Sequence, residues 1–147
     1  MATYFYDTSA IVKRYFAETG SQRVDNMIAD STIIHAISRL TLAEVSAAII
    51  RRLQTAAAVE LVAWFDNDAS VVFGYVIVDD AMFDEAVVLV RRHRLRGCDS
   101  LQLASALRLA QAIGADDDFT FVCADDELNQ AAQAEGLTVE NPNTTRL

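Results

Sequence analysis

The stretch Thr3-Tyr4-Phe5-Tyr6-Asp7-Thr8-Ser9-Ala10 shows how this chain folds. Its first four residues are aromatic or β-branched, which favours a strand, and Asp7 ends that run. A helical segment follows from Ser9 to about Phe16, and Gly20 stops it. A short apolar strand, an acid and a helix therefore follow one another at the start of the chain.

The same alternation continues along the rest of the sequence. We expect further strands at 32–35, 76–78, 119–122 and 137–139, and helices at about 21–29, 41–53, 56–65, 79–93, 99–114 and 126–135. Short apolar strands without alternation are typical of burial on both faces, and the intervening helices indicate right-handed crossovers. The predicted fold class is α/β, a single-domain three-layer α/β/α sandwich with a central parallel sheet, spanning residues 1–147.

Length and composition limit the possible functions. The 147 residues, 52% of them hydrophobic, suit one average domain with a sizeable core. The 12 Lys and Arg against 21 Asp and Glu give a net charge of −9, which argues against a nonspecific phosphate binder and an anionic membrane surface. No apolar run approaches the roughly 18 residues of a membrane span, and no signal peptide is visible. A cytoplasmic location is the expectation.

Four acids occupy positions where strands end or helices begin. Asp7 and Asp125 follow predicted strands, so both lie at the carboxyl edge of the sheet, where α/β proteins bind ligands. Asp99 leads the apolar face of its helix, and Glu44 lies among apolar neighbours. Each acid alone is explained by helix capping or by partial exposure.

Together the four acids need a further explanation. Carboxylates that converge at one sheet edge repel one another, and this raises their pKa values unless a cation lies between them. No Lys or His is next to any of them in the sequence. An oxygen-preferring divalent ion, Mg²⁺ or Mn²⁺, is the natural partner.

Several segments, in this order, resemble the PIN domain family and in particular the small VapC-like toxins of toxin–antitoxin pairs. They are Tyr6-Asp7-Thr8-Ser9-Ala10, Leu42-Ala43-Glu44-Val45, Asp99-Ser100-Leu101-Gln102-Leu103-Ala104-Ser105-Ala106, Phe121-Val122-Cys123-Ala124-Asp125-Asp126-Glu127-Leu128 and Gly136-Leu137-Thr138-Val139. The resemblance implies a metal-dependent endoribonuclease, with Asp7, Glu44, Asp99 and Asp125 as metal-binding acids and Ser9 as a polar helper. It also implies a homodimer that an antitoxin protein captures.

Two other acids remain open as assistants to Asp125. Asp126 is adjacent, and helix capping could exchange the two roles. Asp118 ends the run Asp116-Asp117-Asp118, which we interpret first as a solvated loop.

A carboxylate cluster with divalent ions suits phosphodiester hydrolysis, because the metal activates water and neutralises the departing oxygen. The basic residues then become candidate RNA contacts: Lys13, Arg14, Arg51, Arg92, Arg94 and Arg96. The alternative is that they are solvated helix ends. We expect His35 to be structural and His93, in a basic run, to be solvated.

Two further functions compete with the nuclease. The chain could be a catalytically inactive PIN-fold module that acts by binding a protein. A phosphoacceptor domain would need a well-placed lysine, and the only lysine in the sequence is Lys13, within the first helix. Apolar residues in 49–53 and 59–65 could belong to the core, but these helices are apolar around much of their circumference, which suits a dimer face or a groove for a partner peptide.

Overall fold

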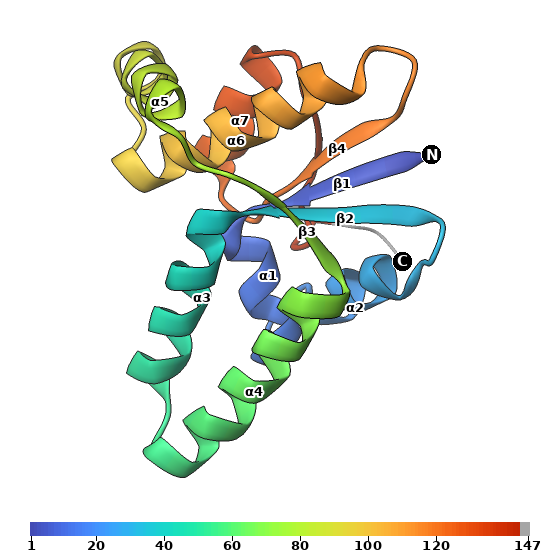
Figure 1. The fold of residues 1–147 in the computed structure, drawn as a ribbon, viewed down its shortest axis with the longest axis vertical. Helices are drawn as coiled ribbons and strands as arrows, with labels where there is room; N and C mark the ends of the chain where they lie inside the picture. Colours follow the sequence, from blue (N-terminus) through green and yellow to red (C-terminus); the bar gives the residue numbers. More distant parts are fainter. Residues whose placement is uncertain (145–147) are drawn as a thin grey trace.

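Five parallel strands lie side by side in the order β3-β2-β1-β4-β5 (Figure 1). The computed structural model describes residues 1–144. The elements are β1 (Ala2–Tyr6), α1 (Thr8–Tyr15), α2 (Ser21–Ala29), β2 (Ile33–Ser38), α3 (Arg39–Arg52), α4 (Thr55–Val71), β3 (Phe73–Val76), α5 (Asp80–His93), α6 (Gly97–Ile113), β4 (Phe119–Val122), α7 (Asp126–Ala134) and β5 (Thr138–Glu140). The predicted α/β sandwich with a central parallel sheet is confirmed.

The central strand β1 supplies both halves of the core. Its Tyr6 side chain belongs to an apolar cluster formed with α1, α2, α3 and α4, and its Phe5 side chain belongs to a second cluster with α5, α6 and α7. Successive side chains of a strand point to opposite faces of the sheet. The helices accordingly form two layers, α1 to α4 on one face and α5 to α7 on the other (Figure 1).

Three predicted elements are wrong at their boundaries. The third strand covers Phe73–Val76 rather than 76–78, and Ile77 beyond it is exposed. Helix α4 continues to Val71 instead of ending near Phe65, and β2 extends to Ser38. β3 lies at the edge of the sheet, beside β2. The apolar run 76–78 overlaps only the last residue of this strand, so the run did not mark the position of the strand.

Helices α3 and α4 extend away from the sheet as an antiparallel pair (Figure 1). A groove near their connection is lined mainly by apolar side chains, among them Ile50, Leu53, Val59 and Val62. Among residues 1–144, no helix is long and apolar enough to cross a membrane.

Candidate active site

Asp7 lies directly after the central strand, where the strand order changes direction between β2 and β4. This is the position at which open parallel sheets bind ligands. The Asp7 carboxylate caps α1, because its Oδ2 accepts hydrogen bonds from the Ser9 backbone N–H (3.0 Å) and from Ser9 Oγ (2.6 Å). The side chain is only 4% exposed, and its other oxygen, Oδ1, has no hydrogen-bond partner among the described residues.

The environment of Asp7 opposes its ionisation. Burial raises the pKa of its carboxyl from 3.8 to about 6, the two Ser9 hydrogen bonds act in the opposite direction, and repulsion from Asp99 and Glu44 raises it further. Asp7 is therefore a buried carboxylate near two other acids, with one oxygen unpartnered.

Glu44 extends from the second turn of α3 and is half-buried. Its Oε1 accepts a hydrogen bond from Thr8 Oγ1 (2.8 Å) and another from Gln102 Nε2 (2.8 Å). Thr8 is the first residue of α1, and Gln102 belongs to α6. Contacts from both helical layers thus fix the Glu44 side chain.

Asp99 lies in the first turn of α6, as predicted, and is half-buried. Burial raises the pKa of its carboxyl, and repulsion from Asp125 and Glu44 adds to the rise. The neighbouring Cys98 is an exposed residue, yet partial burial of its thiol raises the pKa of that group, and Glu44 and Asp99 add to the rise. These shifts place Glu44 and Asp125 each within electrostatic range of Asp99.

Asp125 caps α7, because its Oδ1 accepts a hydrogen bond from the Leu128 backbone N–H (2.8 Å). Its adjacent neighbour Asp126 is exposed and accepts a hydrogen bond from Asn141 (3.3 Å). The capping role therefore belongs to Asp125.

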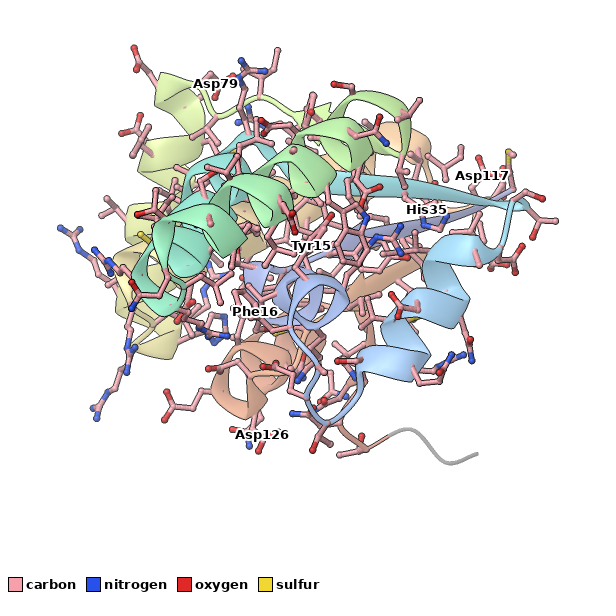
Figure 2. All side chains as sticks on the ribbon, turned by 90° about the horizontal axis from the view of Figure 1, so that it is seen from below. Tyr15, Phe16, His35, Asp79, Asp117 and Asp126 are labelled. Atoms are coloured by element: carbon pink, nitrogen blue, oxygen red, sulfur yellow. The ribbon has the colours of Figure 1, made fainter. Side chains whose placement is uncertain are left out.

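The run Asp116-Asp117-Asp118 precedes β4, whereas Asp125 follows that strand, so the run lies at the opposite edge of the sheet. Figure 2 shows the labelled Asp117 and Asp126 far apart. All three acids of the run are exposed, and Asp117 pairs with the N-terminal ammonium group at 3.4 Å. Asp118 is thus placed away from Asp125.

The four predicted acids form a loose group rather than a finished metal cage. Within residues 1–144, no three His, Cys, Asp or Glu side chains are arranged closely enough to hold a metal ion as they stand. However, the unpartnered Asp7 Oδ1 and the mutual repulsion of the acids both favour a cation between them. The donor set fits Mg²⁺ or Mn²⁺, because Mg²⁺ usually binds one or two carboxylates and keeps several waters.

The structure divides the predicted RNA contacts into two groups. Lys13 is buried, where its ammonium group pairs with Glu18 (3.0 Å) and donates to the Thr19 carbonyl (2.7 Å). Arg14 pairs with the buried Asp68 at 2.8 Å. Both side chains are committed to internal partners, so neither remains a candidate RNA contact.

The other four predicted RNA contacts are arginines on the surface. Arg92 pairs with Glu135, while Arg51, Arg94 and Arg96 are exposed. Arg96 lies close enough to Asp99 to lower the pKa of that carboxyl slightly. One exposed arginine, Arg96, therefore lies near one acid of the site.

The two histidines differ from each other in surroundings. His35 is buried, and its Nδ1 is 2.9 Å from the Tyr6 hydroxyl, which agrees with a structural role. The expectation that His93 is solvated was wrong: it is half-buried, with its Nε2 3.6 Å from Glu135. Glu135, which follows the last residue of α7, lies beside His93, and the sequence around His93 gave no sign of that contact.

Sequence reasoning missed four polar residues of the site: Thr8, Thr41, Gln102 and Cys123. Cys123 is buried with its Sγ 3.7 Å from Asp7 Oδ2 and 3.6 Å from Ser9 Oγ. Gln102 and Thr41 are bonded to each other at 2.9 Å. A signal was present for Gln102, because a carboxamide next to the apolar stripe of α6 needs a partner.

A sequence model of the PIN domain matches residues 4–125, which is most of the chain. The chain belongs to the PIN domain family. This confirms the family expected from the order of the acidic segments. A comparison with curated protein sequences finds no match.

Solved structures share the fold of this PIN domain at low sequence identity. FitAcB from Neisseria gonorrhoeae is 17% identical with a TM-score of 0.71, and the match covers 97% of this chain and 99% of that one. VapC20 from Mycobacterium tuberculosis, described as a sarcin-ricin loop cleaving toxin, is 18% identical with a TM-score of 0.67, covering 92% and 96%. VapBC2 from Rickettsia felis, solved with a fragment of promoter DNA, is 15% identical with a TM-score of 0.64, covering 95% and 98%.

Proposed function

We propose that this PIN domain is a metal-dependent endoribonuclease that hydrolyses RNA phosphodiester bonds as the toxin of a toxin–antitoxin pair. The observation that carries the proposal is the state of Asp7. Its carboxylate is buried, one oxygen has no partner among the described residues, and its pKa is raised by burial first and then by two further acids. A buried carboxylate in these surroundings is costly unless a cation compensates it.

The acids Asp7, Glu44, Asp99 and Asp125 would hold Mg²⁺ or Mn²⁺. When bound, such an ion activates water for attack on phosphorus and neutralises charge on the departing oxygen. Ser9 contributes by holding Asp7 Oδ2 with two hydrogen bonds, so the Oδ1 atom remains for the ion. The Asp125 side chain is held through its Oδ1 atom by the capping of α7.

RNA would approach over the exposed arginines rather than over α1. Arg96 precedes Asp99 by three residues, and Arg94 lies in the left-handed turn that ends α5. Arg51 extends from the last turn of α3, the helix that carries Glu44. Arginines at these positions can contact phosphates on either side of the acids, which offsets the overall negative charge.

Two partners belong to the proposal. The antitoxin would cover the apolar groove between α3 and α4, where Ile50 and Val59 are 62% and 64% exposed. FitAB bound to a DNA fragment and a toxin–antitoxin complex from Klebsiella pneumoniae share the fold and support this partner class.

A second copy of the chain would cover the apolar face that Phe83, Val87 and Leu101 form on α5 and α6. The proposal places the enzyme in the cytoplasm with its RNA.

The test is cleavage of labelled RNA by the purified protein. We expect cleavage with Mg²⁺ or Mn²⁺, none with EDTA, and a loss of at least about 100-fold in Asp99→Asn. Asp117→Asn is the matched control, because it removes an exposed acid at the opposite edge of the sheet. Cleavage that persists in EDTA or in Asp99→Asn would contradict the proposal. Absence of both cleavage and Mn²⁺ binding in the wild type would favour the inactive binding module.

A further inference from the structure

Helix α6 carries a polar stripe in the interior of the protein. Gln102 is 1% exposed, and Ser105, one turn later, is fully buried. Burying a carboxamide costs free energy unless its polar atoms find partners, so the contacts of Gln102 indicate why a polar residue is placed there.

Three acceptors surround the Gln102 nitrogen. Nε2 lies 2.8 Å from Glu44 Oε1, 2.9 Å from Thr41 Oγ1 and 3.0 Å from Thr8 Oγ1. The nitrogen has two hydrogens to donate, and an ionised carboxylate can only accept. The amide nitrogen, and not the amide oxygen, must therefore face Glu44. The Gln102 Oε1 atom is left buried without a partner in the described part of the chain.

The two hydrogen bonds to the Glu44 carboxylate go to the same oxygen. Gln102 and Thr8 both bond to Oε1, one from α6 and the other from α1. Neither bond is made to Oε2. The Glu44 carboxylate is thus fixed through one oxygen while the second keeps its capacity to accept another ligand.

We propose that Gln102 is a positioning residue, which holds Glu44 in the orientation that binds the divalent ion; this inference rests on the proposed function. Hydrogen bonds to the far side of a ligating carboxylate restrict its rotation. The unpartnered Gln102 Oε1 agrees with this role, since the orientation in which the amide nitrogen faces Glu44 leaves the amide oxygen without a hydrogen bond in the described part of the chain.

The same stripe supplies a matched control. Ser105 Oγ lies 2.8 Å from the Leu101 carbonyl and 3.2 Å from Ser38 Oγ, and it contacts none of the four acids. If the polar stripe only attached α6 to the start of α3, substitutions at Gln102 and at Ser105 would have the same effect on Mn²⁺ affinity. A positioning role predicts that the two changes differ.

The experiment is calorimetric titration of the full-length protein with Mn²⁺, with the melting temperature measured in EDTA. In Gln102→Met, which replaces the amide with an apolar side chain of similar size, we expect Mn²⁺ binding to weaken about 10- to 100-fold. Ser105→Ala should bind Mn²⁺ as the wild type does. In a Glu44→Ala background, Gln102→Met should cause no further weakening, because its effect passes through Glu44.

Each outcome decides between support and rejection. Unchanged Mn²⁺ affinity in Gln102→Met, or an equal loss in the Glu44→Ala background, overturns the inference while leaving the nuclease proposal standing. A wild type that binds no Mn²⁺ overturns both. If Gln102→Met does not fold, Thr8→Val replaces it: the loss of the second donor to Glu44 Oε1 should also weaken binding, and unchanged affinity there rejects the positioning of Glu44.

Discussion

Replacing Asp7 with Asn should make the metal-free protein more stable while removing its activity. The rise in the pKa of Asp7 from 3.8 to about 6 means that its ionised form is disfavoured in the folded state. At about 1.4 kcal/mol per pKa unit, the ionised carboxylate costs about 3 kcal/mol above pH 6. The Asn amide avoids that cost but accepts weaker hydrogen bonds from Ser9, a loss of about 1 kcal/mol. We expect a net gain of about 1 to 3 kcal/mol in the free energy of unfolding.

The pH dependence of this gain has a definite sign. Between the unfolded pKa of 3.8 and the folded value of about 6, the folded protein binds more protons than the unfolded chain. The wild type therefore loses stability at Asp7 as the pH rises through that window. The advantage of Asp7→Asn should be full above about pH 6 and should vanish below about pH 4, where both side chains are neutral.

The assay is urea unfolding of both proteins across this pH range, in EDTA and with excess Mn²⁺. Subtracting the free energy of unfolding of the wild type from that of Asp7→Asn at each pH cancels the contribution of the other titrating groups. Mn²⁺ at about 100 times its Kd should stabilise the wild type by about 2.7 kcal/mol and Asp7→Asn much less, which removes or reverses the difference between them. If Asp7→Asn is less stable than the wild type in EDTA near pH 7.5, the reasoning is refuted.

Three further predictions concern parts of the fold away from the acids. Burial lowers the pKa of His35, so the wild type should lose stability as the pH falls below about 6.5, and unfolding of His35→Gln should show a smaller loss. Asp68→Ala leaves Arg14 and the Tyr15 hydroxyl (2.7 Å) without their buried acceptor, and should cost about 3 to 5 kcal/mol in urea unfolding, against about 1 kcal/mol for Tyr15→Phe. Gly20→Ala should lower stability by about 2 kcal/mol in the same assay, because Gly20 has φ +88° and a Cβ there would lie 2.9 Å from the Pro142 carbonyl oxygen.

The order of the elements could be predicted from the sequence because each strand and helix carries its own local signal. Asp7 and Asp99 were expected at a strand end and a helix start, and the structure places them there. These positions depend on nearest neighbours along the chain. Whether their carboxylates bind metal stays a prediction.

Features that depend on distant partners could not be predicted. Helix α4 continues through its polar residues because Asp68 meets Arg14 and Tyr15 of α1. Lys13 is buried because Glu18 and the Thr19 carbonyl are within its reach. In each case the charged side chain has an internal partner that is close to it only in the folded chain.

The two layers of helices each contribute two of the four acids. Asp7 and Glu44 come from the layer of α1 and α3, while Asp99 and Asp125 come from that of α6 and α7. Because Asp7 and Glu44 precede α5 in the sequence while Asp99 and Asp125 follow it, neither half of the chain carries all four acids. The four acids can therefore come together only when both helical layers have packed on the sheet.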